Sequence, residues 1–297
     1  MAKEIVRSCA KINLSLDISG VRQDGYHTVE TVMQKISLFD EVSVDWIPDN
    51  GEEIVICLDS NKPFLPVDGR NIAYKAASLM AERFGNNVGG GKLKIYLNKH
   101  IPVSAGLAGG SGNGAAVMTA LNRLWKIGLS TKYMCKLGAD LGADVPFCLL
   151  TQNSQYGCAL GSGTGADLTV IKSRFRKFVL LVKPAFGVST KEVYQGIDNF
   201  DIKKRPDTKR LMEALKQGDK EDIYSQMINI LELYTLNKYT EVQFIKKTVE
   251  EETSAEKDLM TGSGPTVFAF FPNIGETKKA CLYMRKKGYE AYWARTL

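Results

Sequence analysis

The segment Ile101-Pro-Val-Ser-Ala-Gly-Leu-Ala-Gly-Gly-Ser-Gly-Asn-Gly114 carries the strongest structural signal in this sequence. It follows an alternating apolar pattern at Leu93–Leu97 and leads into an apolar helical pattern at Ala115–Trp125. Glycine lets the backbone approach an anion closely, and a helix N-terminus offers unpaired N–H groups and the positive end of the helix dipole. A flexible surface loop is the alternative, but such loops seldom open into a strongly apolar helix. We therefore predict a phosphate-binding loop.

Neither of the two common nucleotide-binding loops fits this segment. The Walker A pattern requires Gly-Lys-Ser or Gly-Lys-Thr, which does not occur in the chain. Gly110, Gly112 and Ala115 match the loose dinucleotide pattern G-x-G-x-x-A. However, the preceding strand ends more than ten residues upstream, and no carboxylate follows before Asp140. The loop belongs to another class of phosphate site.

The charges around the loop favour an anionic ligand. From Arg83 to Ala139, both included, the chain has no Asp or Glu but eight Lys or Arg residues. Nucleic acid is a rival ligand, but the basic residues are spaced singly and no nucleic-acid-binding motif accompanies them. A solvated basic face is the third interpretation, and charge alone leaves it open.

Composition limits the class of protein. The chain has 297 residues, of which 44% are hydrophobic and 24% charged, as expected for a globular protein of one large or two ordinary domains. The longest apolar runs are far shorter than the roughly 18 residues of a membrane span, and Met1 to Arg7 does not resemble a signal peptide. We therefore expect a cytoplasmic protein with no membrane partner.

Cysteine and histidine usage argues against several chemistries. The six cysteines include no C-x-x-C pair, which disfavours zinc fingers and disulfide frameworks, and we interpret the cysteines as small buried hydrophobic residues. A Ser-His-Asp hydrolase would depend on His27 or His100, and the chain has no G-x-S-x-G elbow. We expect His100 to be an exposed loop residue.

Hydrophobic periodicity predicts an α+β protein of two domains, 1–154 and 155–297. Helical spacing is found at Arg70–Phe84, which ends at Gly85, and at Ser189–Ile197, Glu276–Lys287 and within the helix-prone stretch Thr208–Glu252. Alternating or short apolar runs predict strands at Ala10–Ile18, Val29–Leu38, Glu41–Ile47, Glu53–Leu58, Leu93–Leu97, Phe178–Val182, Thr266–Phe271 and Tyr289–Trp293.

Three separated segments resemble one superfamily, the galactokinase, homoserine kinase, mevalonate kinase and phosphomevalonate kinase (GHMP) group. They are Ala10–Leu14, Pro102–Ala116 and Thr261–Thr266, in the order and at the spacing of the group's three motifs. The resemblance implies a two-domain fold, with a ribosomal protein S5-like N-terminal domain and a ferredoxin-like C-terminal domain. It also implies an active site in the cleft between these domains.

Within this group, further segments resemble the 4-diphosphocytidyl-2-C-methyl-D-erythritol kinase family. They are Gly20-x-Arg-x-Asp-Gly-Tyr-His27 with Thr31 and Gln34, Asp68–Ala77 in the manner of the family's adenine-side helix, and Leu141–Phe147. The resemblance spans essentially the whole chain and implies transfer of the γ-phosphoryl of ATP to the 2-hydroxyl of the methylerythritol unit. Such an enzyme serves the non-mevalonate route to isoprenoid precursors and uses ATP and Mg²⁺.

The resemblance assigns roles to individual residues. Asp144 is the expected base and Lys11 the cation beside it, although a structural buried ion pair is the alternative for this pair. Substrate would contact Asn13, Gly262 and Ser263, while Tyr26, His27 and Phe186 would flank and read the cytosine; for Phe186, core packing is an equally strong interpretation. ATP and its phosphates would contact Asn71, Pro102, Ser104, Ala105, Gly106, Leu107, Ala108, Gly109, Gly110, Ser111 and Gly112. The resemblance does not assign the metal ligands.

The chain departs from the family pattern in the loop. Where the family usually reads Gly-Gly-Gly-Ser-Ser-Asp-Ala-Ala, this chain has Ala108-Gly-Gly-Ser-Gly-Asn-Gly-Ala115, without the second serine and the aspartate. Ser8-Cys9 also replaces the more usual Ala-Pro or Ala-Tyr. Backbone donors and the helix dipole remain, so we expect an active enzyme.

Two other functions stay open at this point. One is another GHMP kinase, of the homoserine or mevalonate type; the segment Asp24–His27 favours a cytidine diphosphate substrate over these. The other is a non-catalytic nucleotide-binding paralogue, which would have lost Lys11 and Asp144, and this chain keeps both. We expect no nucleic-acid partner, and a monomer or homodimer.

Overall fold

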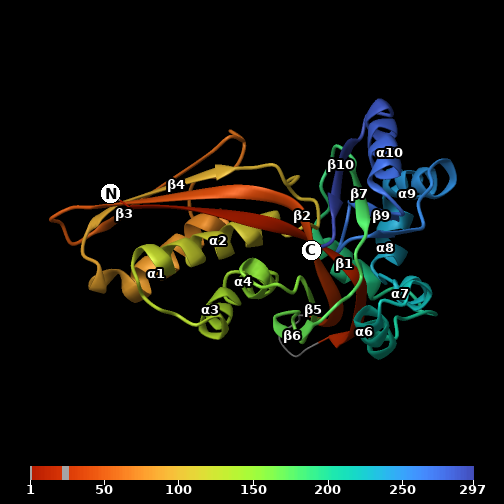
Figure 1. The fold of residues 1–297 in the computed structure, drawn as a ribbon, viewed down its shortest axis with the longest axis horizontal. Helices are drawn as coiled ribbons and strands as arrows, with labels where there is room; N and C mark the ends of the chain where they lie inside the picture. Colours follow the sequence, from red (N-terminus) through yellow and green to blue (C-terminus); the bar gives the residue numbers. More distant parts are fainter. Residues whose placement is uncertain (1, 22–26) are drawn as a thin grey trace. The chain divides into compact units, whose positions relative to one another are not determined.

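The computed structural model describes residues 2–21 and 27–297 and divides the chain into two compact units (Figure 1). The first unit comprises Met1–Ala10, Phe39–Pro102 and Ala108–Gln155, and the second comprises Lys11–Leu38, Val103–Leu107 and Tyr156–Leu297. The units therefore alternate along the chain, whereas the family domains that we predict, 1–154 and 155–297, are sequential. The difference arises because two long N-terminal strands each contribute residues to both units.

The strands are β1 Ala2–Val21, β2 His27–Pro48, β3 Ile54–Ser60, β4 Gly91–Asn98, β5 Cys158–Ser162, β6 Asp167–Ile171, β7 Phe178–Lys183, β8 Lys257–Met260, β9 Val267–Phe271 and β10 Glu290–Arg295. Burial alternates along β4 as the sequence predicts, whereas β7 and β9 are buried along almost their whole length.

Most helices begin where a side chain caps the first turn. Asn71, Ser189 and Asn273 each accept a hydrogen bond from a backbone N–H two or three residues on. The helices are α1 Ile72–Phe84, α2 Gly109–Leu124, α3 Thr131–Gly138, α4 Val145–Gln152, α5 Thr190–Ile197, α6 Thr208–Gln217, α7 Lys220–Gln226, α8 Glu232–Lys238, α9 Thr240–Glu252 and α10 Ile274–Lys286, with a 3₁₀ turn η1 at Gly85–Asn87.

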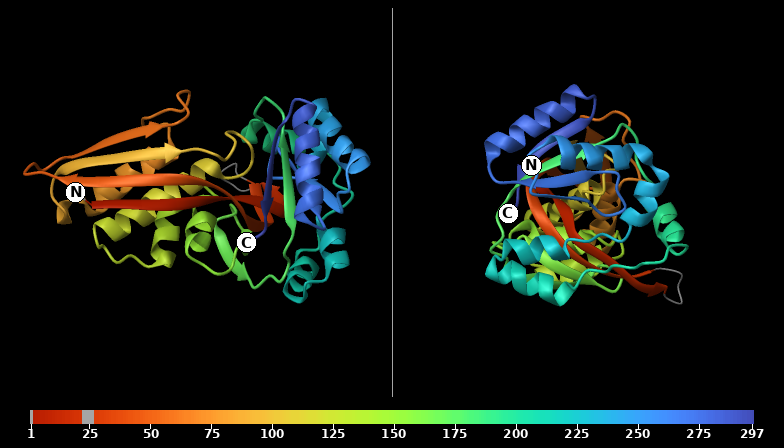
Figure 2. Two further views of the ribbon diagram at one scale, coloured as in Figure 1. Left: turned by 45° about the horizontal axis from the view of Figure 1, so that its top comes forward. Right: turned by 90° about the vertical axis from the view of Figure 1, so that its right-hand side faces the viewer.

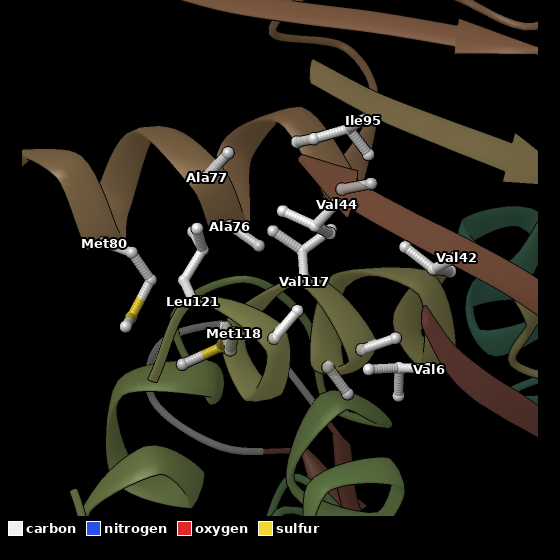
Figure 3. Packing of buried hydrophobic residues seen from close by; sticks show 14 of the residues in the cluster. Val6, Val42, Val44, Ala76, Ala77, Met80, Ile95, Val117, Met118 and Leu121 are labelled. Atoms are coloured by element: carbon white, nitrogen blue, oxygen red, sulfur yellow. The ribbon is translucent and has the colours of Figure 1, made fainter. Parts of the chain in front are cut away.

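The first unit packs helices on one face of a sheet. In it, β3 pairs parallel to β4, and β4 pairs antiparallel to residues 41–48 of β2. Figure 3 shows Val44 and Ile95 of the sheet directed at Ala76, Val117 and Leu121 of α1 and α2. All five of these side chains are at most 2% exposed, so this interface is the core that holds the start of α2 in place.

The second unit contains a four-stranded antiparallel sheet in the order β10-β7-β9-β8. Helices α9 and α10 lie on the same side of this sheet (Figure 2). Their buried residues, such as Ile245 and Met284, share a core with Leu180 of β7 and Phe271 of β9. This arrangement confirms the α+β prediction for the C-terminal half.

Two predicted strands, Val29–Leu38 and Glu41–Ile47, are one continuous strand, β2. The prediction of a break was wrong because Asp40, which looks like a turn residue in the sequence, is fully buried within the strand. Its carboxylate is neutralised by a lysine that lies 59 residues further along the chain. A pairing at that sequence separation leaves no local signal.

The helix predicted at Ala115–Trp125 begins earlier, at Gly109. Glycine is a poor helix former, but here helix packing overrides propensity. A Cβ on Gly114 would lie 2.7 Å from Cγ2 of Ile72 in α1. The glycines therefore permit close contact between α1 and α2, and they place residues 109–112 in the first turn of the helix.

Two smaller predictions concern cysteines and membrane spans. Cys148, Cys158 and Cys281 are buried as predicted, whereas Cys9, Cys57 and Cys135 are partly exposed. Among the residues that the structure describes, we find no helix long and apolar enough to cross a bilayer.

Candidate functional site

Lys11 lies at the centre of a polar cluster in the second unit. Its side chain is buried, and Nζ donates to Oδ1 of Asn13 at 2.8 Å and to the carbonyl oxygen of Gly106 at 3.1 Å. Lys11 and Asn13 share one face of β1 because side chains two residues apart in a strand point the same way. The ammonium is thus held at a defined place by the strand and by the glycine-rich loop.

The third predicted motif reaches the same cluster. The Thr261 hydroxyl donates to Oδ1 of Asn13 and accepts from the Asn13 N–H, both at 3.0 Å. Gly106 has φ +71°, and a Cβ there would lie 2.6 Å from the Thr261 carbonyl oxygen, so only glycine fits. A Cβ on Gly262 would lie 3.7 Å from Lys11 Nζ. Three segments from distant parts of the sequence therefore meet around one buried lysine.

Asn229 supports this cluster, and sequence analysis missed it. It is 2% exposed, and its amide nitrogen donates to the carbonyl oxygens of Met260 and Gly262, both at 2.8 Å. Its amide oxygen accepts from the Leu231 N–H at 3.0 Å. Three hydrogen bonds thus fix the loop that carries Gly262. A single asparagine within a helix-prone stretch has no spacing signal that could have revealed this role.

The start of α2 in the first unit has the features of an anion site. Ala108, the N-cap residue, is in the left-handed region with φ +57° and supplies no side-chain acceptor. The N–H groups of Gly109, Gly110 and Ser111 therefore lack the side-chain cap that usually satisfies a helix start. Gly112 differs, because its N–H bonds to the Ala108 carbonyl oxygen at 2.8 Å.

Asp144 belongs to the same unit as this helix start. It is the N-cap residue of α4 and is half-buried. Two residues earlier, a Cβ on Gly142 would lie 3.9 Å from the Ser111 hydroxyl oxygen, so the loop before α4 lies beside the first turn of α2. Lys11 belongs to the other unit. The pairing of Asp144 with Lys11 stays a prediction.

A buried charge network, which the sequence did not reveal, holds the start of α2. Lys99 Nζ donates to Asp40 Oδ2 and, at 2.8 Å, to Asn113 Oδ1. Asp40 Oδ1 accepts from the N–H groups of His100 and Ile101 at 2.7 and 2.8 Å. Burial lowers the pKa of Lys99, and the Asp40 carboxylate opposes that shift. His100 itself is exposed, as predicted.

Asn113 is one of the departures from the family pattern, and this network explains how the chain uses it. Its amide accepts from Lys99 through Oδ1 and donates to Asp40 Oδ2 at 3.0 Å through Nδ2. A carboxylate could not make the second bond, since it has no hydrogen to donate. The amide therefore suits this pair, and an aspartate would set two carboxylates against each other.

Gly112, the other departure, is linked to Ser8. A Cβ at position 112 would lie 2.3 Å from the Ser8 hydroxyl oxygen, which occupies the space that a side chain would need. That oxygen is buried and has no hydrogen-bond partner among the residues that the structure describes. Ser8 and Gly112 are therefore a coupled pair.

We expect Gly112→Ser to lower the free energy of unfolding by about 1 kcal/mol, because the new side chain overpacks against Ser8. Ser8→Ala alone should be close to neutral, since it removes an unsatisfied buried hydroxyl. In the double variant the loss from Gly112→Ser should largely disappear. Urea unfolding of the wild type, both single variants and the double variant measures the coupling. Strictly additive effects would show that the two positions are independent.

The residues expected to bind cytosine lie in the second unit, except that Tyr26 falls outside the described residues. The His27 side chain is 7% exposed, its Nε2 lies 2.8 Å from Asp198 Oδ1, and its ring centroid is 5.4 Å from that of Tyr194. Phe186 is half-buried and stacks on Tyr239 at a centroid distance of 5.7 Å. One face of Phe186 is therefore used in packing, and its stacking on a base stays a prediction.

The remaining site residues have mixed positions. Ser263 is 7% exposed, and its hydroxyl oxygen lies 3.0 Å from that of Thr190. Asn71 caps α1 and donates to the Pro66 carbonyl oxygen, so its side chain has a structural task whether or not it contacts adenine. In the loop before α2, Ser104 is exposed, Gly106 and Ala108 are half-buried, and Pro102, Ala105 and Leu107 are buried.

Comparison with known proteins assigns the class first. Residues 71–152 match the family model described as the GHMP kinases N terminal domain, and this range contains the start of α2 and Asp144. The crystal structure of homoserine kinase from Cytophaga hutchinsonii aligns over 100% of this chain and 96% of that one, with a TM-score of 0.71 and 18% identity. That likeness concerns the fold alone. The chain has the GHMP kinase fold.

Full-length relatives narrow the assignment. The 4-diphosphocytidyl-2-C-methyl-D-erythritol kinase of Alkaliphilus oremlandii is 44% identical over 297 residues, which is 100% of this chain and 97% of the relative. A crystal structure of 4-(cytidine 5'-diphospho)-2C-methyl-D-erythritol kinase aligns over 99% of both chains with a TM-score of 0.79 and 28% identity. The chain belongs to the 4-diphosphocytidyl-2-C-methyl-D-erythritol kinase family, as its motifs indicate.

Proposed function

We propose that the protein transfers the γ-phosphoryl group of ATP to the 2-hydroxyl of 4-diphosphocytidyl-2-C-methyl-D-erythritol, in the non-mevalonate route to isoprenoid precursors. The observation that carries the proposal is the meeting of three kinase motifs around the buried ammonium of Lys11, in a chain of this family. The alternatives are a homoserine or mevalonate type of kinase and a non-catalytic paralogue. Retention of both Lys11 and Asp144 argues against the paralogue.

The start of α2 suits the phosphates of ATP. Uncapped N–H groups at Gly109, Gly110 and Ser111 can donate to phosphate oxygens, and the helix dipole adds a favourable field. Lys99 Nζ would lie 3.2 Å from a Cβ on Gly109, so the Lys99–Asp40 ion pair lies directly behind this turn and holds it in position. Phosphoryl transfer depends mainly on such positioning and charge stabilisation.

Asp144 and Lys11 divide the acceptor chemistry. Asp144 would orient the 2-hydroxyl and accept its proton as the phosphoryl group arrives. The Lys11 ammonium, oriented by Asn13 and Gly106, would stabilise the negative charge that develops on the acceptor oxygen and the transferring group. Because the hydrogen bonds that orient the ammonium are already formed, the ammonium needs little reorientation when negative charge develops in the reaction.

Mg²⁺ is the expected companion of ATP in this reaction, where it neutralises phosphate charge. We find no cluster of three or more acidic, cysteine or histidine side chains that could hold a metal among the residues that the structure describes. Mg²⁺ commonly binds substrate phosphates and water with only one or two protein carboxylates, so its binding does not depend on such a cluster. The Ser111 hydroxyl in the first turn of α2 is one group that could contribute.

We further propose that the enzyme acts in the cytoplasm as a monomer or homodimer. Its two substrates are charged, water-soluble small molecules, and no step of the reaction requires a nucleic acid or a membrane.

A coupled ATP-consumption assay with four acceptors tests the proposal. The cytidyl substrate should be phosphorylated, whereas homoserine, mevalonate and galactose should give rates near background. Preferential turnover of homoserine or mevalonate would replace the proposal with that kinase. Absence of turnover with all four, at saturating ATP and Mg²⁺, would favour the paralogue.

Tyr26 and His27 should govern affinity for the cytidyl substrate. Replacing Tyr26 with Ala removes a stacking face, for which the expected loss is about 1 to 3 kcal/mol. We expect His27→Ala to raise KM for the cytidyl substrate roughly tenfold by removing a hydrogen bond, with kcat changing less. His100→Ala is the matched control, because His100 is exposed and the chain has only these two histidines. Equal effects of the two histidine variants would argue against a role for His27.

A further inference from the structure

Helix α5 connects the parts of the expected nucleoside site within the second unit. At its first residue, the Thr190 hydroxyl is hydrogen-bonded to the hydroxyl of Ser263 in the Thr261–Thr266 segment. On its first turn, Glu192 accepts from the Tyr239 hydroxyl at 2.8 Å, and Tyr239 stacks on Phe186. At its C-terminal end, the C-cap residue Asp198 bonds to His27. No sequence motif singled out α5.

We propose that Asp198 is a positioning residue that fixes the tautomer of His27, leaving Nδ1 as a hydrogen-bond acceptor, and that this makes the site select cytosine over uracil. The proposal deepens the proposed function and rests on it. Asp198 contacts His27, the residue expected to bind the cytosine, and need not contact the substrate itself.

The geometry assigns the proton on His27. A carboxylate can only accept, so the 2.8 Å contact between Asp198 Oδ1 and His27 Nε2 requires the hydrogen to be on Nε2. In a neutral imidazole the other nitrogen, Nδ1, then carries a lone pair. Nδ1 has no hydrogen-bond partner within the described ranges 2–21 and 27–297. The ring cannot easily turn over to exchange the two nitrogens, because it is 7% exposed and packs against Tyr194.

Cytosine and uracil differ at position 4 of the ring, where a hydrogen-bond acceptor such as Nδ1 of His27 can distinguish them. Cytosine presents a 4-amino group, which donates, whereas uracil presents a 4-oxo group, which only accepts. An Nδ1 lone pair therefore pairs with cytosine and opposes the oxygen of uracil. A site built to hydrogen-bond one group rejects an analogue that leaves its buried polar atom unpaired. The same ring with its hydrogen on Nδ1 would have the opposite preference.

Nitrogen NMR tests the tautomer directly and without turnover. The chain has two histidines, so a long-range ¹H–¹⁵N correlation spectrum shows two imidazoles, and His100→Gln assigns them. Wild-type His27 should show the Nε2–H tautomer at neutral pH. In Asp198→Ala its nitrogen shifts should move toward those of a freely exchanging imidazole. An Nδ1–H tautomer in the wild type, or identical shifts in both proteins, would overturn the proposal.

Kinetics test the consequence for specificity. We expect the ratio of kcat/KM for the cytidyl substrate to that for its uridyl analogue to fall about tenfold in Asp198→Ala, mainly through KM. Asp198→Asn keeps an accepting oxygen and should fall less. Asp201→Ala, which removes another exposed carboxylate three residues on, should leave the ratio unchanged. A ratio in Asp198→Ala equal to that of the wild type would contradict the proposal.

Binding of cytidine and uridine diphosphates separates this proposal from the proposed function. If His27 has the expected tautomer and cytidine diphosphate binds at least tenfold more tightly than uridine diphosphate, the proposal about Asp198 is supported even if no acceptor is phosphorylated. Failure of turnover would then count against the kinase function alone. Equal affinity for the two diphosphates would overturn the proposal whatever the activity.

Discussion

Asp144→Asn is expected to lower kcat by about 100-fold or more while ATP affinity stays nearly unchanged. The substitution keeps the size of the side chain at the start of α4 but removes its ability to take the proton of the acceptor hydroxyl. Steady-state kinetics with the cytidyl substrate and a separate measurement of ATP binding distinguish the two effects. Asp140→Asn is the matched control, since it makes the same chemical change at an exposed position four residues earlier.

The same experiment decides between catalysis and a structural ion pair for Asp144. If its role is structural, Asp144→Asn should lower the free energy of unfolding and leave kcat of the folded protein largely intact. If its role is catalytic, the unfolding transition should stay close to that of the wild type while kcat falls. An unchanged kcat in a folded variant removes Asp144 from the mechanism.

Lys99→Met should cause the largest loss of stability, about 3 kcal/mol or more. The variant leaves the Asp40 carboxylate, which is 0% exposed, without its cation, and breaking one partner of a buried pair is strongly destabilising. Two backbone N–H groups and the Asn113 amide still donate to Asp40. We therefore expect a loss near the lower end of the roughly 3 to 5 kcal/mol that breaking a buried ion pair costs. Urea unfolding, followed by a probe in the first unit, gives the measurement.

Two further variants make this prediction specific. Lys94→Met changes an exposed lysine of β4 and should alter the free energy of unfolding by only a few tenths of a kcal/mol. The double variant Asp40→Asn with Lys99→Met removes both charges, so it should be more stable than Lys99→Met alone. A single variant as stable as the Lys94→Met control would show that the pair does not hold the start of α2.

The sequence by itself determined the class of this protein. The alternating pattern around Ala10–Ile18 and the glycine-rich run to Gly114 are local, and local periodicity is what backbone geometry imposes on a sequence. The Thr261–Thr266 segment completed the set. Because each motif is contiguous and the three occur in a fixed order, the sequence alone indicates the family and its main candidate site residues, including Lys11 and Gly106.

Only the tertiary structure revealed the residues that hold the site in place. Asp40 bonds to Lys99 across 59 positions, and His27 bonds to Asp198 across 171. Asn229 acts through two carbonyl oxygens more than 30 positions away. These pairings depend on side chains brought together by packing, and no period or spacing in the sequence encodes them. The sequence determined which chemistry the chain offers, whereas the packed structure decided which polar groups orient it, because hydrogen-bond partners are chosen in space rather than along the chain.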